Sequence, residues 1–181
     1  MTTDSPKTVL VTGAAKRLGR AIALKLAGAG WSVAVHCRES RAEAAEVANA
    51  VTALGVKSVV VEADLAREDE TAALVPASVK ALGPLTGLVN NASLFENDNI
   101  SNVSRASWES HIAVNLRAPF FACQAAIPIM RQQGGGGERP EVCRSKIADE
   151  TRRHGRLLGP HGEQVADRQE GQRGAVHLPD E

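Results

Sequence analysis

Short runs of apolar, mostly β-branched residues alternate with alanine-rich stretches along the first 133 positions of this sequence. The apolar runs have the length of buried strands, and the stretches between them carry apolar residues at helical spacing. This pattern predicts four strands, over residues 8–12, 32–38, 57–64 and 87–93. It also predicts four helices, over residues 18–30, 41–55, 68–82 and 107–133.

Three prolines fall inside the predicted helices. Pro76 weakens the middle of the third helix, which can kink or break there, and Pro119 and Pro128 are expected to bend the long fourth helix. Strands that alternate with helices through short loops form βαβ units, and these favour a parallel sheet. We therefore expect an α/β fold, a doubly wound parallel sheet that is incomplete, with about four strands.

Residues 134–181 differ in composition from the rest of the chain. Only seven of these 48 residues are Val, Ile or Leu, none is Phe, Trp, Met or Tyr, and nine are Gly. Such a segment buries too little apolar surface to offset the entropy lost on ordering. We expect residues 1–133 to form the folded domain and 134–181 a poorly ordered or locally helical tail. A frame slip in a G+C-rich gene would produce this composition, and a native tail is the alternative.

Charge and cysteine content argue against several classes of protein. Lys plus Arg and Asp plus Glu each total 21, so no excess charge favours nucleic acid or an anionic membrane. The N-terminus lacks the basic flank of a signal peptide, and no uninterrupted apolar run approaches about 18 residues. The three cysteines are widely spaced and the histidines after residue 150 have no predicted partners, so we expect no metal site. These features predict a soluble cytoplasmic protein.

Two glycines flank the junction between the first strand and the first helix, in the stretch VTGAAKRLGRAIA (11–23). Gly13 ends the strand where a tight turn needs a residue without a β-carbon, and Gly19 opens the helix where backbone must pass close to a ligand or strand. The free N–H groups at such a helix start, together with the helix dipole, favour a pyrophosphate. A tight turn with no binding role would use the same residues, but their position at the first βα junction favours a dinucleotide site.

Basic residues occupy the end of the second strand, in the stretch HCRES (36–40). Dinucleotide-binding folds that prefer NAD place an acid about 20 residues beyond the glycines, where it binds the ribose hydroxyls. This chain instead has His36 and Arg38 there, with Arg17 in the glycine loop, and these suit the 2′-phosphate of NADP. Glu39 would oppose this if it pointed inward, and a solvated strand end is the alternative interpretation.

Polar residues also follow the third and fourth strands. Asp64 could accept a hydrogen bond from an adenine amino group, or could equally cap the next helix. Asn90, Asn91 and Ser93 lie at the carboxyl edge of the sheet, where ligands bind in such folds. Phe95 could stack on a flat heteroaromatic ligand or simply pack under its loop.

One polar residue, Asn115, lies among apolar positions of the predicted fourth helix. A buried asparagine must find hydrogen-bond partners. We expect Asn115 to hold a backbone carbonyl or a water molecule.

Together, and in this order along residues 7–133, these motifs resemble the short-chain dehydrogenase/reductase family. Finer details resemble its pteridine reductase branch: the loop TGAAKRLGR with Arg17 in place of the family's middle glycine, the stretch HCRES, NNAS rather than NNAG, and Phe95. The resemblance implies a Rossmann-type fold, NADP(H) as the cofactor, hydride transfer to a carbonyl or imine of a small molecule such as a pterin, and homo-oligomers.

The resemblance also assigns residues. Ser93 and Phe95 would contact the pterin, and the cluster of Arg17, His36, Arg38 and Ser40 would select NADPH. Asn115 would be the accessory catalytic asparagine of the fourth helix. The full cofactor-binding set would be Gly13, Arg17, Leu18, Gly19, His36, Arg38, Ser40, Asp64, Leu65, Asn91, Ala92 and Ser93.

The chain contains no tyrosine. In the resembled family a Tyr, assisted by a Lys four residues later, supplies or removes the proton, and a general acid must reach the reacting atom. The sequence therefore predicts a reductase whose own chemistry is lost, with a non-enzymatic NADP-binding or interaction protein as the alternative. A Rossmann-type methyltransferase is disfavoured because its cofactor has no 2′-phosphate for Arg38 to bind.

Overall fold

The computed structural model describes residues 7–132, and the predicted boundary at 133/134 and the tail after it lie outside them. The described residues form four strands, each starting within one residue of its predicted position. They are β1 (Thr8–Val11), β2 (Ser32–Cys37), β3 (Ser58–Glu62) and β4 (Gly87–Val89).

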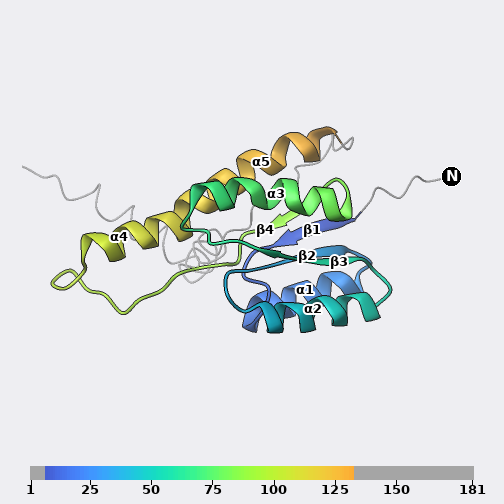
Figure 1. Ribbon diagram of the computed structural model, residues 1–181, viewed down its shortest axis with the longest axis horizontal. Helices are drawn as coiled ribbons and strands as arrows, with labels where there is room; N and C mark the ends of the chain where they lie inside the picture. The colour runs from blue at the N-terminus through green and yellow to red at the C-terminus, as the bar shows by residue number, and fades with distance from the viewer. Residues whose placement is uncertain (1–6, 133–181) are drawn as a thin grey trace, which may run out of the picture. The chain divides into compact units, whose positions relative to one another are not determined.

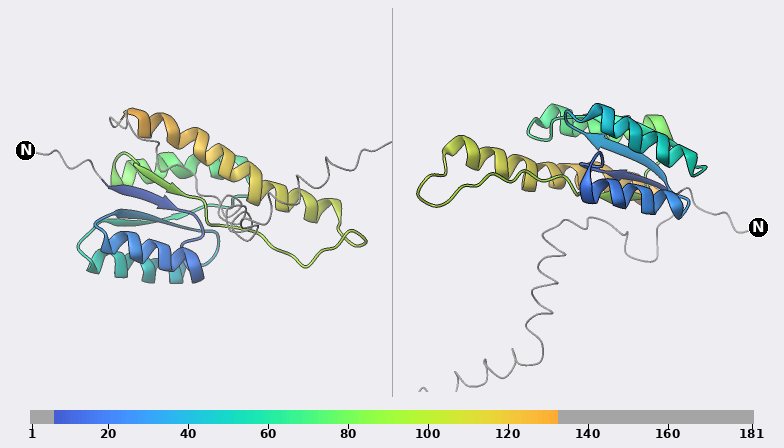
Figure 2. Two further views of the ribbon diagram at one scale, coloured as in Figure 1. Left: turned by 180° about the vertical axis from the view of Figure 1, so that it is seen from behind. Right: turned by 90° about the horizontal axis from the view of Figure 1, so that it is seen from below.

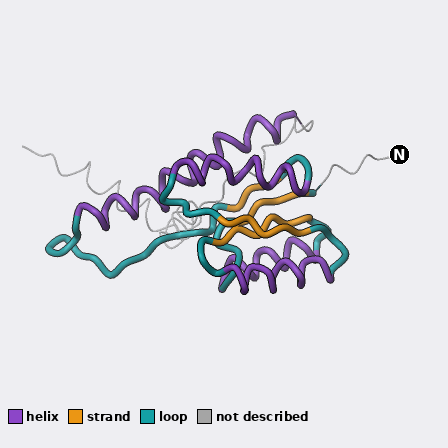
Figure 3. Tube along the Cα trace, in the orientation of Figure 1, coloured by secondary structure: helices purple, strands orange, loops and turns teal. Residues whose placement is uncertain are grey.

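The four strands form one parallel sheet in the order β3-β2-β1-β4 (Figures 1 and 3). Strand β1 lies in the interior of the sheet, and Leu10 pairs with Ala34 on one side and Leu88 on the other. All four residues of β1 are buried, because helices cover both of its faces. The prediction of an α/β fold with a doubly wound, four-stranded parallel sheet is confirmed.

Alternate strand residues support two separate cores. Val9, Val33 and Val35 face helices α1 (Arg17–Gly28) and α2 (Arg41–Ala53). Leu10, Ala34 and Leu88 face helices α3 (Glu68–Leu82) and α5 (Ala118–Gln132) on the opposite face (Figures 1 and 2). Helix α3 runs without a break through Pro76, at the predicted bounds.

The predicted fourth helix is one helical segment with an irregular middle. It comprises α4 (Arg105–Ile112), a π-helical turn η1 (Ala113–Arg117) and α5. It starts two residues before the predicted position, because the Ser104 hydroxyl accepts the Ser107 N–H at 3.0 Å and caps it. The wide turn ends two residues before Pro119, which has no N–H to donate and whose ring would collide with a carbonyl one α-turn earlier. Pro128 lies inside α5 without interrupting it.

The prediction of a strand over residues 87–93 is wrong in its second half, since β4 ends at Val89. Its neighbour β1 ends at Val11, so the backbone beyond Val89 has no strand to pair with. Instead the Thr12 hydroxyl accepts the N–H groups of Asn91 and Ala92, at 2.9 and 3.0 Å. This side chain turns the segment after β4 into the loop that carries the candidate site.

The segment 105–132 has an inner and an outer apolar set. Ala118, Ala122, Ala126 and Met130 are buried against the core. Four more apolar side chains, spaced four residues apart, are exposed: Trp108, Ile112, Leu116 and Phe120. By length and composition alone this is the one helix among the described residues that could cross a membrane. That criterion is weak, because core helices of globular domains also meet it, and α5 packs against α3 and the sheet.

Candidate functional site

All four strands are parallel, so the segments that follow them meet at one edge of the sheet. The glycine loop after β1 is tied to the end of β2 by a hydrogen bond from the Ala14 N–H to the His36 carbonyl, 2.8 Å long. It is tied to the loop after β4 by the Asn91 side chain, whose Nδ2 donates to the Thr12 and Gly13 carbonyls at 2.9 and 3.1 Å. Residues that are far apart in the sequence are thus brought to one place.

Both glycines of the loop are required by its geometry. Gly13 has φ +62°, and a β-carbon there would lie 2.9 Å from the Ala92 Cα. Gly19 is buried in the first turn of α1, and a β-carbon there would overlap the Gly13 carbonyl oxygen and lie 2.6 Å from Asn91 Nδ2. The predicted roles in a tight turn and in a close approach of backbone are confirmed for Gly13 and Gly19.

Helix α1 starts at this loop with its first amides uncapped. Lys16 precedes the helix in an extended conformation, and its side chain makes no capping hydrogen bond. Together with the positive end of the helix dipole, such amides can bind an anionic group. Leu18 is exposed beside them.

Arg17 adopts a conformation that side chains usually avoid. Its φ of 50° is the only positive value for a residue other than glycine in the part of the chain that the structure describes. A β-carbon in this left-handed region costs about 1–2 kcal/mol. The cost is incurred at the position where the resembled family has glycine.

Cationic and anionic side chains alternate around the ends of β1 and β2. Arg38 Nε lies 3.0 Å from Glu39 Oε1, and Lys16 Nζ lies 2.7 Å from Glu43 Oε1. The hydrogen bond from Lys16 lowers the pKa of the exposed Glu43 carboxyl below its usual value. Glu39 does not point inward, since its side chain is 79% exposed. Arg17 has no ion pair among residues 7–132.

The side chains of Lys16, Arg17 and Arg38 form the cationic group of the site. His36 does not belong to it, and the predicted contact of His36 with a 2′-phosphate is wrong. The side chain is buried, its Nδ1 accepts the Gly13 N–H at 3.0 Å, and its Nε2 lies 3.0 Å from the Ala63 carbonyl oxygen. Burial is the main cause that lowers the pKa of His36 below its usual value, so the ring is neutral at pH 7. Ser40 directly precedes α2, and its side chain makes no capping hydrogen bond there.

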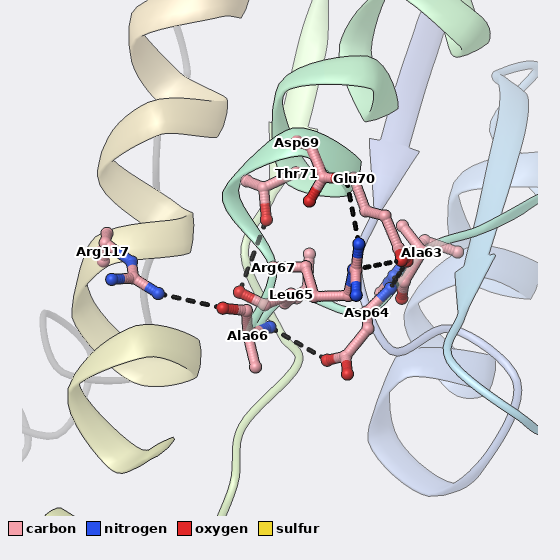
Figure 4. Close-up of polar contacts among 10 residues, drawn as sticks. Ala63, Asp64, Leu65, Ala66, Arg67, Asp69, Glu70, Thr71 and Arg117 are labelled. Atoms are coloured by element: carbon pink, nitrogen blue, oxygen red, sulfur yellow. Dashed lines mark hydrogen bonds and ion pairs between the residues drawn. The ribbon is translucent and has the colours of Figure 1, made fainter. Parts of the chain in front are cut away.

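The loop after β3 is held by the side chain of Asp64 and by side chains from the first turn of α3 (Figure 4). Asp64 Oδ1 accepts the Ala66 N–H at 2.9 Å, while the Asp64 N–H donates to Glu70 Oε2 at 2.6 Å. Asp64 therefore does not cap α3, which starts after Arg67. Of its two predicted roles, only the hydrogen bond to an adenine amino group stays a prediction. The side chain of Leu65 is buried in the core, which leaves its backbone for any ligand contact.

Asn115 confirms the prediction that it holds a backbone carbonyl. Its Nδ2 donates to the Leu94 carbonyl and its Oδ1 accepts the Leu94 N–H, both at 2.8 Å. This pair of bonds fixes the loop after β4 against the π-helical turn and places Ser93 and Phe95 on either side of the fixed residue. Phe95 is 86% exposed, so it does not pack under the loop.

Three residues that shape the site were not among the predicted ones. Thr12 organises the loop after β4, and a polar residue directly after an apolar strand was the signal for it. Lys16 is part of the cationic group, as the sequence AAKR suggests. Arg117 donates to the Ala66 carbonyl at 2.9 Å (Figure 4), which ties the π-helical turn to the loop after β3. It also pairs with Glu68, the first residue of α3, at 3.1 Å. No local pattern in the sequence indicates that contact.

Comparison with known proteins agrees with this geometry. The sequence matches the family described as short chain dehydrogenase over residues 7–137, well over half of the chain. The chain belongs to this family. It is 37% identical over 130 residues to the 3-oxoacyl-[acyl-carrier-protein] reductase of Staphylococcus aureus, which covers 72% of this chain and 53% of that reductase.

The chain is also similar to solved structures. One is alternative dihydrofolate reductase 1 from Brucella suis in complex with NADP, with TM-score 0.64, 37% identity, and coverage of 72% of this chain and 52% of that one. Another is a short chain dehydrogenase from Burkholderia cenocepacia in complex with NADP, with TM-score 0.66, 34% identity, and coverage of 67% and 50%. The chain thus spans about half the length of these relatives.

Proposed function

We propose that this chain is the cofactor-binding half of an NADPH-dependent reductase, and that the 181-residue form binds NADP(H) without turning over a substrate. The observation that carries the proposal is the end of β2, where Arg38 stands in place of the acid that would bind the ribose hydroxyls of NAD. Arg17 extends from the neighbouring glycine loop without an ion pair among the described residues. The two guanidinium groups offer the 2′-phosphate charge-assisted hydrogen bonds.

The other residues at the carboxyl edge of the sheet suit the rest of the dinucleotide. The uncapped start of α1 suits the pyrophosphate, and Asp64 is available to the adenine. NADPH, when bound, would supply the hydride. The residues of this chain would bind and orient NADPH, and Asn91 and Ala92 would bring the loop after β4 to the side of the cofactor.

A pterin-like substrate is the finer part of the proposal. Its support is the exposed Phe95, held next to the anchored Leu94, together with the likeness to the Brucella suis alternative dihydrofolate reductase. An exposed ring on a fixed loop can stack on a flat heteroaromatic molecule. Ser93, on the other side of Leu94, offers a hydroxyl to the polar edge of the same molecule.

Calorimetry on the full chain tests the cofactor. NADPH should bind more tightly than NADH, and Arg38→Ala should weaken NADPH binding by about tenfold or more, because it removes a charge-assisted hydrogen bond. The matched control is Arg105→Ala, which removes an equal charge that pairs with Glu109 on α4 and should change nothing. Equal affinities for the two cofactors would refute the proposal.

Turnover distinguishes a reductase that has lost its chemistry from an active one. No tyrosine is present, so we expect no NADPH oxidation with pterins, quinones or carbonyl compounds. If the gene carries a frame slip, another frame downstream should encode a Val/Ile-rich strand and then Tyr-x-x-x-Lys, and restoring it should yield activity. Enzyme-like rates from the 181-residue form would refute the proposed loss.

The lack of tyrosine also favours a second candidate, a non-enzymatic NADP-binding or interaction protein. It shares the predicted cofactor preference with the first. The coding DNA separates them, because a native tail requires that neither alternative frame encodes the missing catalytic residues.

A further inference from the structure

His36 contacts the glycine loop through both its backbone and its side chain. Its carbonyl oxygen accepts the Ala14 N–H at 2.8 Å, and its ring Nδ1 accepts the Gly13 N–H at 3.0 Å. The other ring nitrogen, Nε2, lies 3.0 Å from the Ala63 carbonyl oxygen at the end of β3. One buried side chain therefore joins the loops that follow β1 and β3.

The partners of the ring determine where its proton lies. The Gly13 amide can only donate, so Nδ1 must be the unprotonated acceptor. The Ala63 carbonyl can only accept, so Nε2 carries the hydrogen. This is one specific tautomer of neutral imidazole, and a proton on Nδ1 would place two donors against each other.

We propose that His36 is a positioning residue for the glycine loop, and that through Gly13 it sets how tightly the chain binds the diphosphate of a dinucleotide. The inference rests on the proposed function and deepens it. Gly13 is held from both sides, since Nδ1 of His36 takes its N–H and Nδ2 of Asn91 donates to its carbonyl at 3.1 Å.

The consequence for the ligand follows from which amides remain. With the Gly13 and Ala14 N–H groups both bonded to His36, the loop offers a phosphate only the amides nearer the start of α1. If Nδ1 no longer held the Gly13 N–H, the peptide unit between Thr12 and Gly13 could turn, and the Thr12 carbonyl that accepts from Asn91 would turn with it. The same Asn91 Nδ2 holds the Gly13 carbonyl, which packs against Gly19, so loss of this arrangement would displace the amides that bind the phosphate.

Two substitutions separate the two ring bonds. In His36→Asn, Oδ1 can replace Nδ1 as the acceptor for Gly13, and the bond to Ala63 is lost. In His36→Gln, Nε2 can replace the ring Nε2 as the donor to Ala63, and the bond to Gly13 is lost. Each variant removes one buried hydrogen bond, so the two should lose similar amounts of thermal stability.

Their affinities for NADPH should differ. By calorimetry on the full chain, His36→Asn should remain within about threefold of the parent, while His36→Gln should bind about tenfold or more weakly. Amide hydrogen exchange in the ligand-free chain should show Gly13 protected in the parent and in His36→Asn, and unprotected in His36→Gln. Equal affinities for the two variants, or affinities that merely follow thermal stability, would overturn the proposal.

A measurement on the parent chain covers the case in which a variant does not fold. Nitrogen-15 NMR of the His36 ring should show an unprotonated Nδ1 and a protonated Nε2, and a proton on Nδ1 would overturn the proposal. A parent chain that does not bind NADPH would overturn the proposed function and the effect on affinity. Protection of the Gly13 amide would then still decide whether His36 holds the loop.

Discussion

Gly19 and Gly13 are in direct backbone contact across the candidate site, and a β-carbon on residue 19 would overlap the carbonyl oxygen of residue 13. That carbonyl also accepts a hydrogen bond from Asn91 Nδ2, which would lie 2.6 Å from the same β-carbon. Neither neighbour can move without breaking the link between the loops after β1 and β4. The smallest side chain at position 19 therefore disturbs both.

Gly19→Ala should lower the free energy of unfolding by about 1–3 kcal/mol, as expected for an overpacked interior position. It should also abolish detectable NADPH binding. Gly28→Ala at the other end of α1 is the control, because nothing lies within 4 Å of its β-carbon position. Urea unfolding and calorimetry on both variants test this, and a Gly19→Ala chain as stable as the parent would contradict the geometry.

Arg17→Gly should separate stability from binding. Relief of the left-handed conformation should raise the free energy of unfolding by up to about 1 kcal/mol. Loss of the guanidinium should weaken NADPH binding and leave NADH binding nearly unchanged. Arg20→Gly, in the same helix with ordinary backbone angles, should instead destabilise the chain by about 1 kcal/mol. Destabilisation by Arg17→Gly would show that the strain is absent.

Asn115→Ala should release the loop after β4. It removes two hydrogen bonds to Leu94, so the free energy of unfolding should fall by about 2 kcal/mol. Amide exchange at Leu94 should become faster, whereas Gln124→Ala at an exposed position of α5 should leave it unchanged. An unchanged exchange rate at Leu94 would show that something other than Asn115 fixes the loop.

Stability should depend on pH in two separate ranges. Burial lowers the pKa of His36 below its unfolded value of 6.5. The contribution of neutral His36 to the free energy of unfolding is therefore complete above pH 6.5, and it is lost as the pH falls through the lower folded pKa. The pKa values of the exposed Glu43 and Asp69 are lowered by hydrogen bonds from Lys16 and Arg67 respectively, so their small contributions are lost only at more acidic pH.

Urea unfolding across the acid range would resolve these contributions. In the parent the midpoint should begin to fall just below pH 6.5, and in His36→Asn this first decline should be missing. A first decline that persists in the variant would assign it to another group.

The exposed apolar residues of the segment 105–132 should make the chain associate in solution. Trp108 is 60% exposed and Phe120 63%, and β4 pairs on only one side among the described strands. Both features favour concentration-dependent aggregation. Trp108→Lys combined with Phe120→Lys should reduce it in light scattering, and Gln124→Lys should not. A parent chain that stays monodisperse on heating would contradict this prediction.

The sequence predicted those parts of the fold that depend on local pattern. The strands and α3 follow from runs of β-branched residues and from helical spacing, and both glycines of the loop follow from their place at a strand–helix junction. The same reasoning found Asn115, because an amide among apolar neighbours needs partners.

Prediction from the sequence failed where the outcome depends on the direction in which a side chain points. His36 and Arg38 are two residues apart, and sequence alone treats them as equivalent basic groups. The strand ends between them, so His36 points into the interior while Arg38 lies beyond the sheet in solvent. The end of β4 was also misplaced, because the hydroxyl of Thr12, distant in sequence, replaces the backbone ladder there.

The hydrogen bonds between Thr12 and Asn91 close a separation of 79 residues. Contacts of such long range carry a large loop-closure entropy, which the rest of the fold must offset before they are stable. The glycine loop thus acquires its binding geometry only in molecules whose sheet is complete from β3 to β4. A dinucleotide would therefore bind only chains in which β4 has joined the sheet, and not partly folded forms that lack it. Its binding would raise the free energy of unfolding of the whole sheet in proportion to the logarithm of the dinucleotide concentration.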